Sequence, residues 1–130
     1  MHQSIAGTDT IQSGRDKEKL AHARNFSLGM VGFYGHTSEN EKIYRKILKS
    51  RNAAEHFTQI IRSEESTNEA KLYAACGLRT LSLTLFRNEI QNILKNGGTA
   101  SVLRADTLNK EEMTNLIESI DKFGCNKTTK

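Results

Sequence analysis

Four basic side chains recur at helical spacing in the first half of the chain: Lys42, Arg45, Lys46 and Lys49. The intervals i, i+3, i+4 and i+7 place them on one face of a helix, opposite an apolar stripe. Positive charge focused in this way attracts an acidic protein surface or a phosphate backbone. Arg51 extends the series, and Arg62 is a further candidate. A second interpretation is a solvated face that serves only solubility.

The excess positive charge of the chain is local. The 130 residues carry a formal net charge of +4 at pH 7. Residues 38–62 hold six basic and three acidic side chains, whereas residues 63–130 hold equal numbers of each. Tyr44 and Phe57 fall at apolar helix positions, which leaves few aromatic rings to stack on bases and argues against a single-stranded nucleic acid as partner.

The sequence contains no arrangement of residues typical of an enzyme. None of the histidines has a second ligand at helical spacing, so we expect neither a metal nor another cofactor; they are His2, His22, His36 and His56. The glycines of residues 29–35 are not followed by the Gly-Lys-Ser/Thr of a phosphate-binding loop, and close packing of a loop against a helix explains them. We therefore expect a binding protein rather than an enzyme.

Cys76 and Cys125 are the two cysteines of the chain. Cys76 lies on an apolar helix face without a nearby histidine to activate it as a nucleophile. One interpretation is a disulfide that closes most of the C-terminal half, for which chain entropy predicts roughly 4 kcal/mol of stabilisation. The other is a buried Cys76 and a free, exposed Cys125, since cytosolic proteins rarely keep disulfides.

Helices are expected to position these groups, because the chain lacks proline and its apolar residues recur at helical spacing. We expect a flexible tail over residues 1–14 and one domain over residues 15–130. A first helix runs from Arg15 toward Phe26. Helix starts are predicted at four capping residues, Ser38 (with Glu41), Asn52, Ser82 and Asn109 (with Glu112). Gly97, Gly98 and Gly124 are predicted to end helices, and residues 99–103 to be briefly extended.

Two predicted helix pairs are related by a shift of 29 residues. The matches fall at core positions: Ile43 with Leu72, Tyr44 with Tyr73, Phe57 with Phe86, and Ile61 with Ile90. This period predicts an all-α fold, a short stack of antiparallel helix hairpins of the HEAT/armadillo-like α-solenoid type in a single domain. The alternative is two ordinary amphipathic hairpins whose core residues agree by chance.

Three stretches of sequence resemble a known family. Residues 26–39, Phe-Ser-Leu-Gly-Met-Val-Gly-Phe-Tyr-Gly-His-Thr-Ser-Glu, lead into a helix with Ile43 and Tyr44. Residues 69–78, Glu-Ala-Lys-Leu-Tyr-Ala-Ala-Cys-Gly-Leu, precede Phe86, and Gly-Cys stands at residues 124–125. Over about residues 26–125 the chain resembles small bacterial HEAT/armadillo-like helical proteins. It is similar to the immunity proteins of contact-dependent growth inhibition systems, particularly those paired with EndoU-type nuclease toxins.

The resemblance implies a cytoplasmic inhibitor that binds the C-terminal nuclease domain of a cognate toxin and blocks its active site. No catalytic residue carries over, because such an immunity protein has none. The alternative function is a helical module that binds nucleic acid through the basic face. The apolar stretches are too short to span a bilayer, and residues 1–14 lack the apolar core of a signal peptide. We therefore expect a protein that stays inside the cell, or one from which a leader has been removed.

Overall fold

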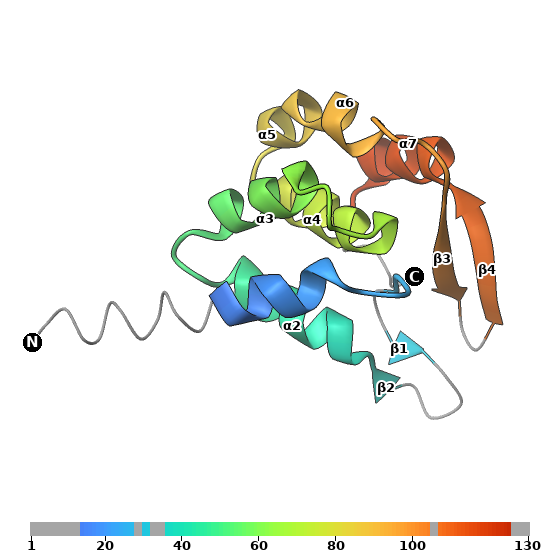
Figure 1. The fold of residues 1–130 in the computed structure, drawn as a ribbon, viewed down its shortest axis with the longest axis horizontal. Coiled ribbons are helices and arrows are strands. Elements are labelled where there is room, and N and C mark those ends of the chain that lie inside the picture. The colour runs from blue at the N-terminus through green and yellow to red at the C-terminus, as the bar shows by residue number, and fades with distance from the viewer. Residues whose placement is uncertain (1–13, 28–29, 32–35, 105–106, 126–130) are drawn as a thin grey trace, which may run out of the picture.

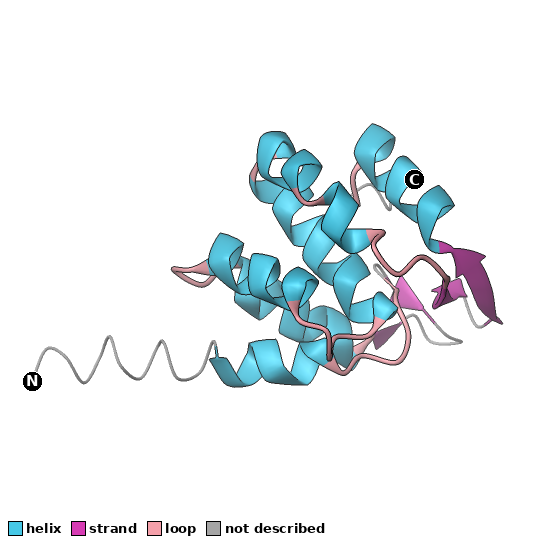
Figure 2. Ribbon diagram, turned by 45° about the horizontal axis from the view of Figure 1, so that its top comes forward, coloured by secondary structure: helices cyan, strands magenta, loops and turns pink. Residues whose placement is uncertain are grey.

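One long helix, α4 (Asn68–Leu81), lies at the centre of the fold, and the other helices pack around it (Figure 1). The computed structural model describes residues 14–27, 30–31, 36–104 and 107–125. Figure 2 shows the helices filling most of the molecule and the strands gathered at one side. Besides α4 and an N-terminal helix over residues 14–21, the elements are β1 (Met30–Val31), β2 (His36–Thr37), α2 (Glu39–Leu48), α3 (Ala53–Arg62), α5 (Leu83–Asn88), α6 (Ile90–Ile93), β3 (Thr99–Arg104), β4 (Thr107–Glu112) and α7 (Met113–Phe123).

Two of the predicted capping residues start their helices as expected. The Ser38 hydroxyl accepts from the backbone N–H of Glu41 at 3.0 Å, and the Ser82 hydroxyl accepts from that of Leu85 at 3.3 Å. Each bond satisfies one of the donors that a helix start leaves free. Asn52 stands at the N-cap position of α3, but its side chain makes no capping hydrogen bond.

Glycines with left-handed backbone angles follow two helices, as predicted. Gly97 and Gly98 have φ of 61° and 87°, and Gly124 has φ of 73°. These angles are unstrained only for glycine, so the chain turns sharply at both places. The first turn leads from α6 into β3, which confirms the predicted extended segment, and the second ends α7.

The core lies along α4, where every residue from 70 to 78 is buried. An amphipathic surface helix would alternate buried and exposed faces, so this continuous burial marks a helix enclosed on all sides. α2, α3, α5, α6 and α7 all contact it. The largest fully buried side chains come from most of these helices and include Tyr44, Phe57, Tyr73, Phe86 and Met113.

A disulfide between Cys76 and Cys125 joins the centre of α4 to the residue that follows Gly124, with the two Cα atoms 5.6 Å apart. Of the two arrangements that the sequence left open, the structure contains the bridged one. The bridge holds the end of α7 against the core.

The prediction of an all-α fold is wrong, because the chain also forms two antiparallel two-stranded sheets. β3 pairs with β4 in register from Thr99 opposite Glu112 to Arg104 opposite Thr107. Asn109, predicted to cap the last helix, lies within β4, and α7 begins only at Met113. β3 buries Ala100 and Val102, whereas β4 is almost entirely exposed and is held by its backbone pairing. A strand with no buried face leaves no alternation of apolar residues to detect.

The stack of equal helix hairpins is also not observed. α4 has 14 residues where α2 has 10, and the helix predicted to run on from Ser82 is divided at Glu89 into α5 and α6. In a solenoid each repeat contacts only its neighbours, but here α4 touches elements from both halves of the chain. The residues matched by the 29-residue shift are buried, except for half-buried Ile90, because they share one core around α4.

Some expectations fall on residues that the structure does not describe. They are most of the expected N-terminal tail, residues 1–13, and the glycines at 29, 32 and 35. β1 and β2, which flank residues 32–35, pair through Met30 with Thr37 and Val31 with His36. Within the described ranges, no helix has the length and apolar character needed to cross a bilayer.

Candidate functional site

α2 carries the four basic side chains on its solvent side, and we call Lys42, Arg45, Lys46 and Lys49 the α2 basic face. The Ser38 cap fixes where the helix begins and therefore which residues turn inward. Ile43, Tyr44 and Ile47 are buried on the inner side. All four members of the α2 basic face are exposed, as their spacing predicts.

Arg45 differs from the three lysines because it has a carboxylate partner. Its Nε donates to Oε2 of Glu41 at 2.8 Å, and its Nη2 forms an ion pair with the same oxygen at 2.7 Å. The Glu41 side chain is only 3% exposed, whereas that of Arg45 is 46% exposed. The guanidinium also lies 6.0 Å from the centre of the Tyr44 ring, within cation–π range. The carboxylate of Glu41 thus partly neutralises the charge of Arg45 and holds its guanidinium in place.

The ammonium groups of the three lysines are exposed to solvent. Within the described part of the chain, no ion pair forms at Lys42, Lys46 or Lys49. Lys46 lies in the last turn of α2 and Lys49 is its C-cap, next to the partial negative charge of the helix end. This position stabilises the ammonium groups on the helix without a carboxylate to neutralise them.

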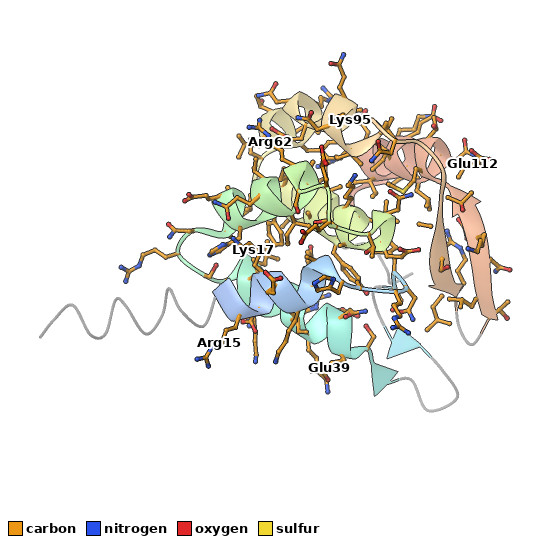
Figure 3. All side chains as sticks on the ribbon, in the orientation of Figure 1. Arg15, Lys17, Glu39, Arg62, Lys95 and Glu112 are labelled. Atoms are coloured by element: carbon orange, nitrogen blue, oxygen red, sulfur yellow. A yellow bond between two sulfur atoms is a disulfide. The ribbon has the colours of Figure 1, made fainter. Side chains whose placement is uncertain are left out.

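The sequence offers Arg51 and Arg62 as extensions of the α2 basic face, but the two residues lie at opposite ends of the α3 segment. Arg51 is exposed in the turn between α2 and α3, close in the chain to Lys49. Arg62 lies at the far end of α3, where it donates to both carboxylate oxygens of Glu89, at 3.1 and 2.6 Å. Figure 3 shows Arg62 beside Lys95, on the side of the molecule away from α2. The α2 basic face therefore continues to Arg51 and not to Arg62.

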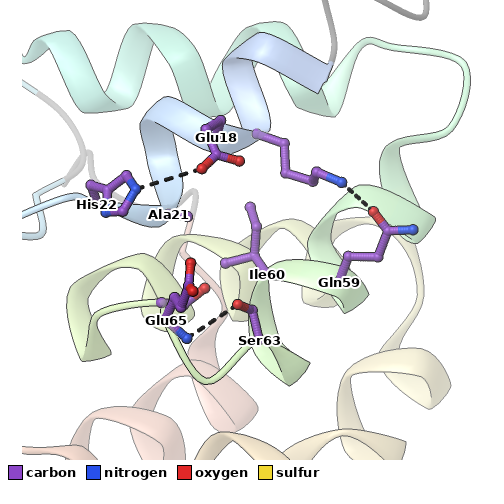
Figure 4. A pocket seen from close by; sticks show the side chains of 9 residues that line it. Glu18, Ala21, His22, Gln59, Ile60, Ser63 and Glu65 are labelled. Carbon is purple, nitrogen blue, oxygen red and sulfur yellow. Dashed lines mark hydrogen bonds and ion pairs between the residues drawn. The ribbon is translucent and has the colours of Figure 1, made fainter.

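A hollow of about 440 Å³ lies between the N-terminal helix and α3 (Figure 4). Its polar contacts are local: the exposed His22 and Glu18 side chains are 3.7 Å apart, and Lys17 donates to Gln59. The Ser63 hydroxyl accepts from the backbone N–H of Glu65 at 3.2 Å. Among the described residues that line this hollow, neither a histidine nor a carboxylate hydrogen-bonds to the Ser63 hydroxyl. Nothing among them therefore activates Ser63 as a nucleophile.

The rest of the described structure adds no metal centre. Among these residues, no group of three or more His, Cys, Asp or Glu side chains gathers closely enough to hold an ion. Both cysteines are in the disulfide and are not available as thiolates.

Comparison with known proteins does not assign the chain to a family. No protein-family model matches it, and neither does any curated protein or solved structure.

Two charged residues have positions in the structure that the sequence pattern does not predict. The spacing of Glu41 from Ser38 predicts only a capping residue, but Glu41 is the buried partner of Arg45. Nothing in the helical spacing marks Lys71, but it is only 4% exposed on α4. Its position in the run Glu-Ala-Lys-Leu-Tyr-Ala-Ala-Cys, where the following residues are apolar, is the one signal that could have identified it.

Proposed function

We propose that the protein acts by binding another protein through the α2 basic face, and that the partner presents acidic side chains to it. The observation that carries this proposal is the presence on one side of α2 of three exposed lysines that form no ion pair with any residue the structure describes. Elsewhere, Arg62, Arg87 and Arg104 each meet a carboxylate from another element. Unpaired charge concentrated on a rigid helix speeds the encounter with an oppositely charged surface.

The rigidity of the helix supports the proposal further. Tyr44 and Ile47 anchor α2 in the core, and the bond between Arg45 and Glu41 fixes the one arginine of the face. A surface that is already ordered loses little conformational entropy when a partner arrives. The three lysines supply long-range attraction, and the fixed guanidinium supplies directional donors for a carboxylate.

The more specific form of this proposal is the immunity role that the sequence resemblance implies. In that role the partner is the nuclease domain of a cognate contact-dependent toxin, and the protein covers its active site. The resemblance indicates the EndoU type in particular. The acidic side chains that the basic face requires then belong to the toxin. The alternative, a module that binds nucleic acid through the same face, makes a different prediction about the ligand.

Co-expression with the C-terminal nuclease domain of a contact-dependent toxin, taken from any such toxin gene found next to the gene of this protein, tests the immunity role. We expect one peak containing both chains on gel filtration, together with restored growth of the cells that make the toxin. Separate peaks and no rescue would exclude the immunity role. A titration with mixed oligonucleotides at low salt provides the second arm, because affinity for nucleic acid that falls steeply with salt would favour the alternative function instead.

The immunity role also implies a cytoplasmic protein, and the disulfide allows that to be tested. Cytosolic thiols are kept reduced, so alkylation under denaturing conditions, in cells quenched rapidly with acid, should label Cys76 and Cys125 if the protein works there. Unfolding is needed because Cys76 is fully buried in the folded protein. Protection of both cysteines from alkylation would place the protein in an oxidising compartment. That result would contradict the cytoplasmic immunity role. It would not bear on protein binding through the α2 basic face, which the binding measurements test separately.

A further inference from the structure

A second hollow, separate from the α2 basic face, lies where the end of α3, the first turns of α4 and the segment after α6 meet. Its volume is about 550 Å³. Lys71 of α4 lines it together with Lys95, which follows α6. Its other side chains are mostly polar and come from residues 61–64 and from Asn92 and Asn96. Two lysines therefore line one small polar space.

Lys71 is the unusual member of this set. The Thr67 hydroxyl caps α4 by accepting from the N–H of Ala70 at 3.0 Å, which fixes the first turn and the position of Lys71 just beyond it. The residue is 4% exposed, and in the described structure its ammonium group has neither a hydrogen bond nor an ion pair. A buried charge without a partner is costly, so burial and then repulsion by Lys95 lower the pKa of Lys71.

The nearby carboxylates do not neutralise these lysines. Glu89 is already occupied, because it accepts two bonds from Arg62 and a third from the side-chain amide of Asn92 at 3.0 Å. Burial alone would raise the pKa of Glu89, but these hydrogen bonds outweigh it and the pKa is lowered. Glu64 lines the hollow and is exposed, and it forms no ion pair with either lysine in the described structure.

We propose that this hollow binds a phosphate group, either as free phosphate or as a small phosphomonoester, between Lys71 and Lys95. A phosphate dianion balances two ammonium groups, whereas one carboxylate would balance only one. Lysine binds phosphate as a compact point charge, and the side-chain amides of Asn92 and Asn96 can donate to further phosphate oxygens. Binding would supply the anionic partner that Lys71 lacks. The site lies away from α2 and does not depend on the partner-binding proposal.

Calorimetric titration of the full chain at constant ionic strength tests this site, with inorganic phosphate as the first probe. Ribose 5-phosphate in a parallel titration distinguishes the two sources of the group, since tighter binding of the sugar phosphate would identify a phosphomonoester as the ligand. We expect saturable binding of at least one probe with a dissociation constant near or below about 1 mM. Lys71→Met keeps the length of the side chain, removes its charge and should weaken binding about tenfold or more.

Two further variants keep the result interpretable if Lys71→Met disturbs folding. Lys95 is exposed, so Lys95→Gln should preserve the fold and still weaken phosphate binding severalfold. Glu64→Gln removes the negative side chain at the rim and should strengthen binding. Lys110→Gln, on exposed strand β4, is the matched control and should leave binding unchanged. The proposal would be overturned if phosphate gave no more binding heat than sodium chloride at the same ionic strength. It would also be overturned if Lys95→Gln and Lys110→Gln weakened phosphate binding equally.

Discussion

The guanidinium of Arg45 is bonded to a carboxylate that the protein almost encloses, that of Glu41 one turn earlier on α2, at 2.7 Å. This contact divides the α2 basic face into one anchored arginine and three lysines without ion pairs in the described structure. The arginine contributes to the stability of the helix, and in the proposed function the lysines contribute the attraction to a partner. Substitutions on the same face should therefore have different consequences.

Arg45→Met should destabilise the protein by about 1–2 kcal/mol, because it withdraws a charged donor from a nearly buried carboxylate. Urea unfolding followed by circular dichroism measures the change in the free energy of unfolding. Arg87→Met is the matched control, since the side chains of Arg87 and its partner Asp121 are 57% and 31% exposed and such pairs contribute little. Equal losses in the two variants would show that burial of Glu41 is unimportant.

Gly77→Ala should destabilise the protein by about 2 kcal/mol net. A Cβ at this position would overlap the ring of Phe57, which is fully buried and has little room to move. Alanine gains about 1 kcal/mol of helix propensity, and overpacking a core costs up to about 3 kcal/mol. Thermal unfolding measures the difference. Gly14→Ala is the control because nothing lies within 4 Å of the added atom.

A second substitution makes the Gly77 prediction specific. If the clash with the Phe57 ring is the cause, Phe57→Leu should destabilise the Gly77→Ala variant less than it destabilises the wild type. Simple additivity of the two losses would mean that the glycine is needed for some other reason.

Reduction of the disulfide should destabilise the protein by roughly 4 kcal/mol, since the bridge closes a loop between residues 49 apart in sequence. The expected loss is measured by urea unfolding with and without dithiothreitol. The Cys76→Ala/Cys125→Ala variant should unfold at the same low urea concentration in both conditions. Unchanged stability of the wild type after complete reduction would mean that packing alone holds α7 against α4.

Acid should destabilise the protein partly through His56. Its ring is 8% exposed, and neither ring nitrogen has a hydrogen-bond partner in the described structure. Burial, and then the charge of Lys17, lower the pKa of His56 from 6.5, while Glu55 opposes this weakly. As the pH falls below about 6.5 the unfolded chain takes up this proton first, so stability is lost at up to about 1.4 kcal/mol per pH unit.

The His56 effect can be isolated by comparing variants across pH. His56→Leu should lose less stability than the wild type between pH 7 and pH 5, as measured by urea midpoints. His22→Leu, which alters an exposed histidine, is the control variant for the loss of an imidazole. Parallel curves for the wild type and His56→Leu would show that His56 does not titrate differently on folding.

The sequence predicted the helical part of the fold where the signals were local. Ser38 and Ser82 cap helices, and Gly97 and Gly124 follow helices. Most apolar residues of α2, α3 and α7 are buried as their spacing indicates, whereas Phe123 at the end of α7 is exposed. The strand β4 was missed because Asn109 and Glu112 imitate a helix cap in a segment with almost no buried side chain. Its conformation depends on pairing with β3, which is a tertiary interaction.

The candidate sites were predictable to a similar extent. Helical spacing was enough to place Lys42, Lys46 and Lys49 together on the exposed side of α2. The pairing of Arg62 with Glu89, 27 residues away, could not be read from spacing, because it depends on how α3 lies against the segment between α5 and α6. The hollow around Lys71 is likewise assembled from three separate segments of the chain.

The central proposal is that the α2 basic face draws in an acidic protein partner, and the association rate measures this most directly. Stopped-flow binding to the toxin domain that co-purifies with the protein should be recorded at several salt concentrations for two variants with equal changes in net charge. Lys42→Glu/Lys46→Glu alters the face, and Lys110→Glu/Lys122→Glu alters exposed lysines on β4 and α7. We predict that the first variant associates at least about tenfold more slowly at low salt and with weaker salt dependence, while the second stays close to the wild type. Equal association rates for the two variants would contradict the proposal.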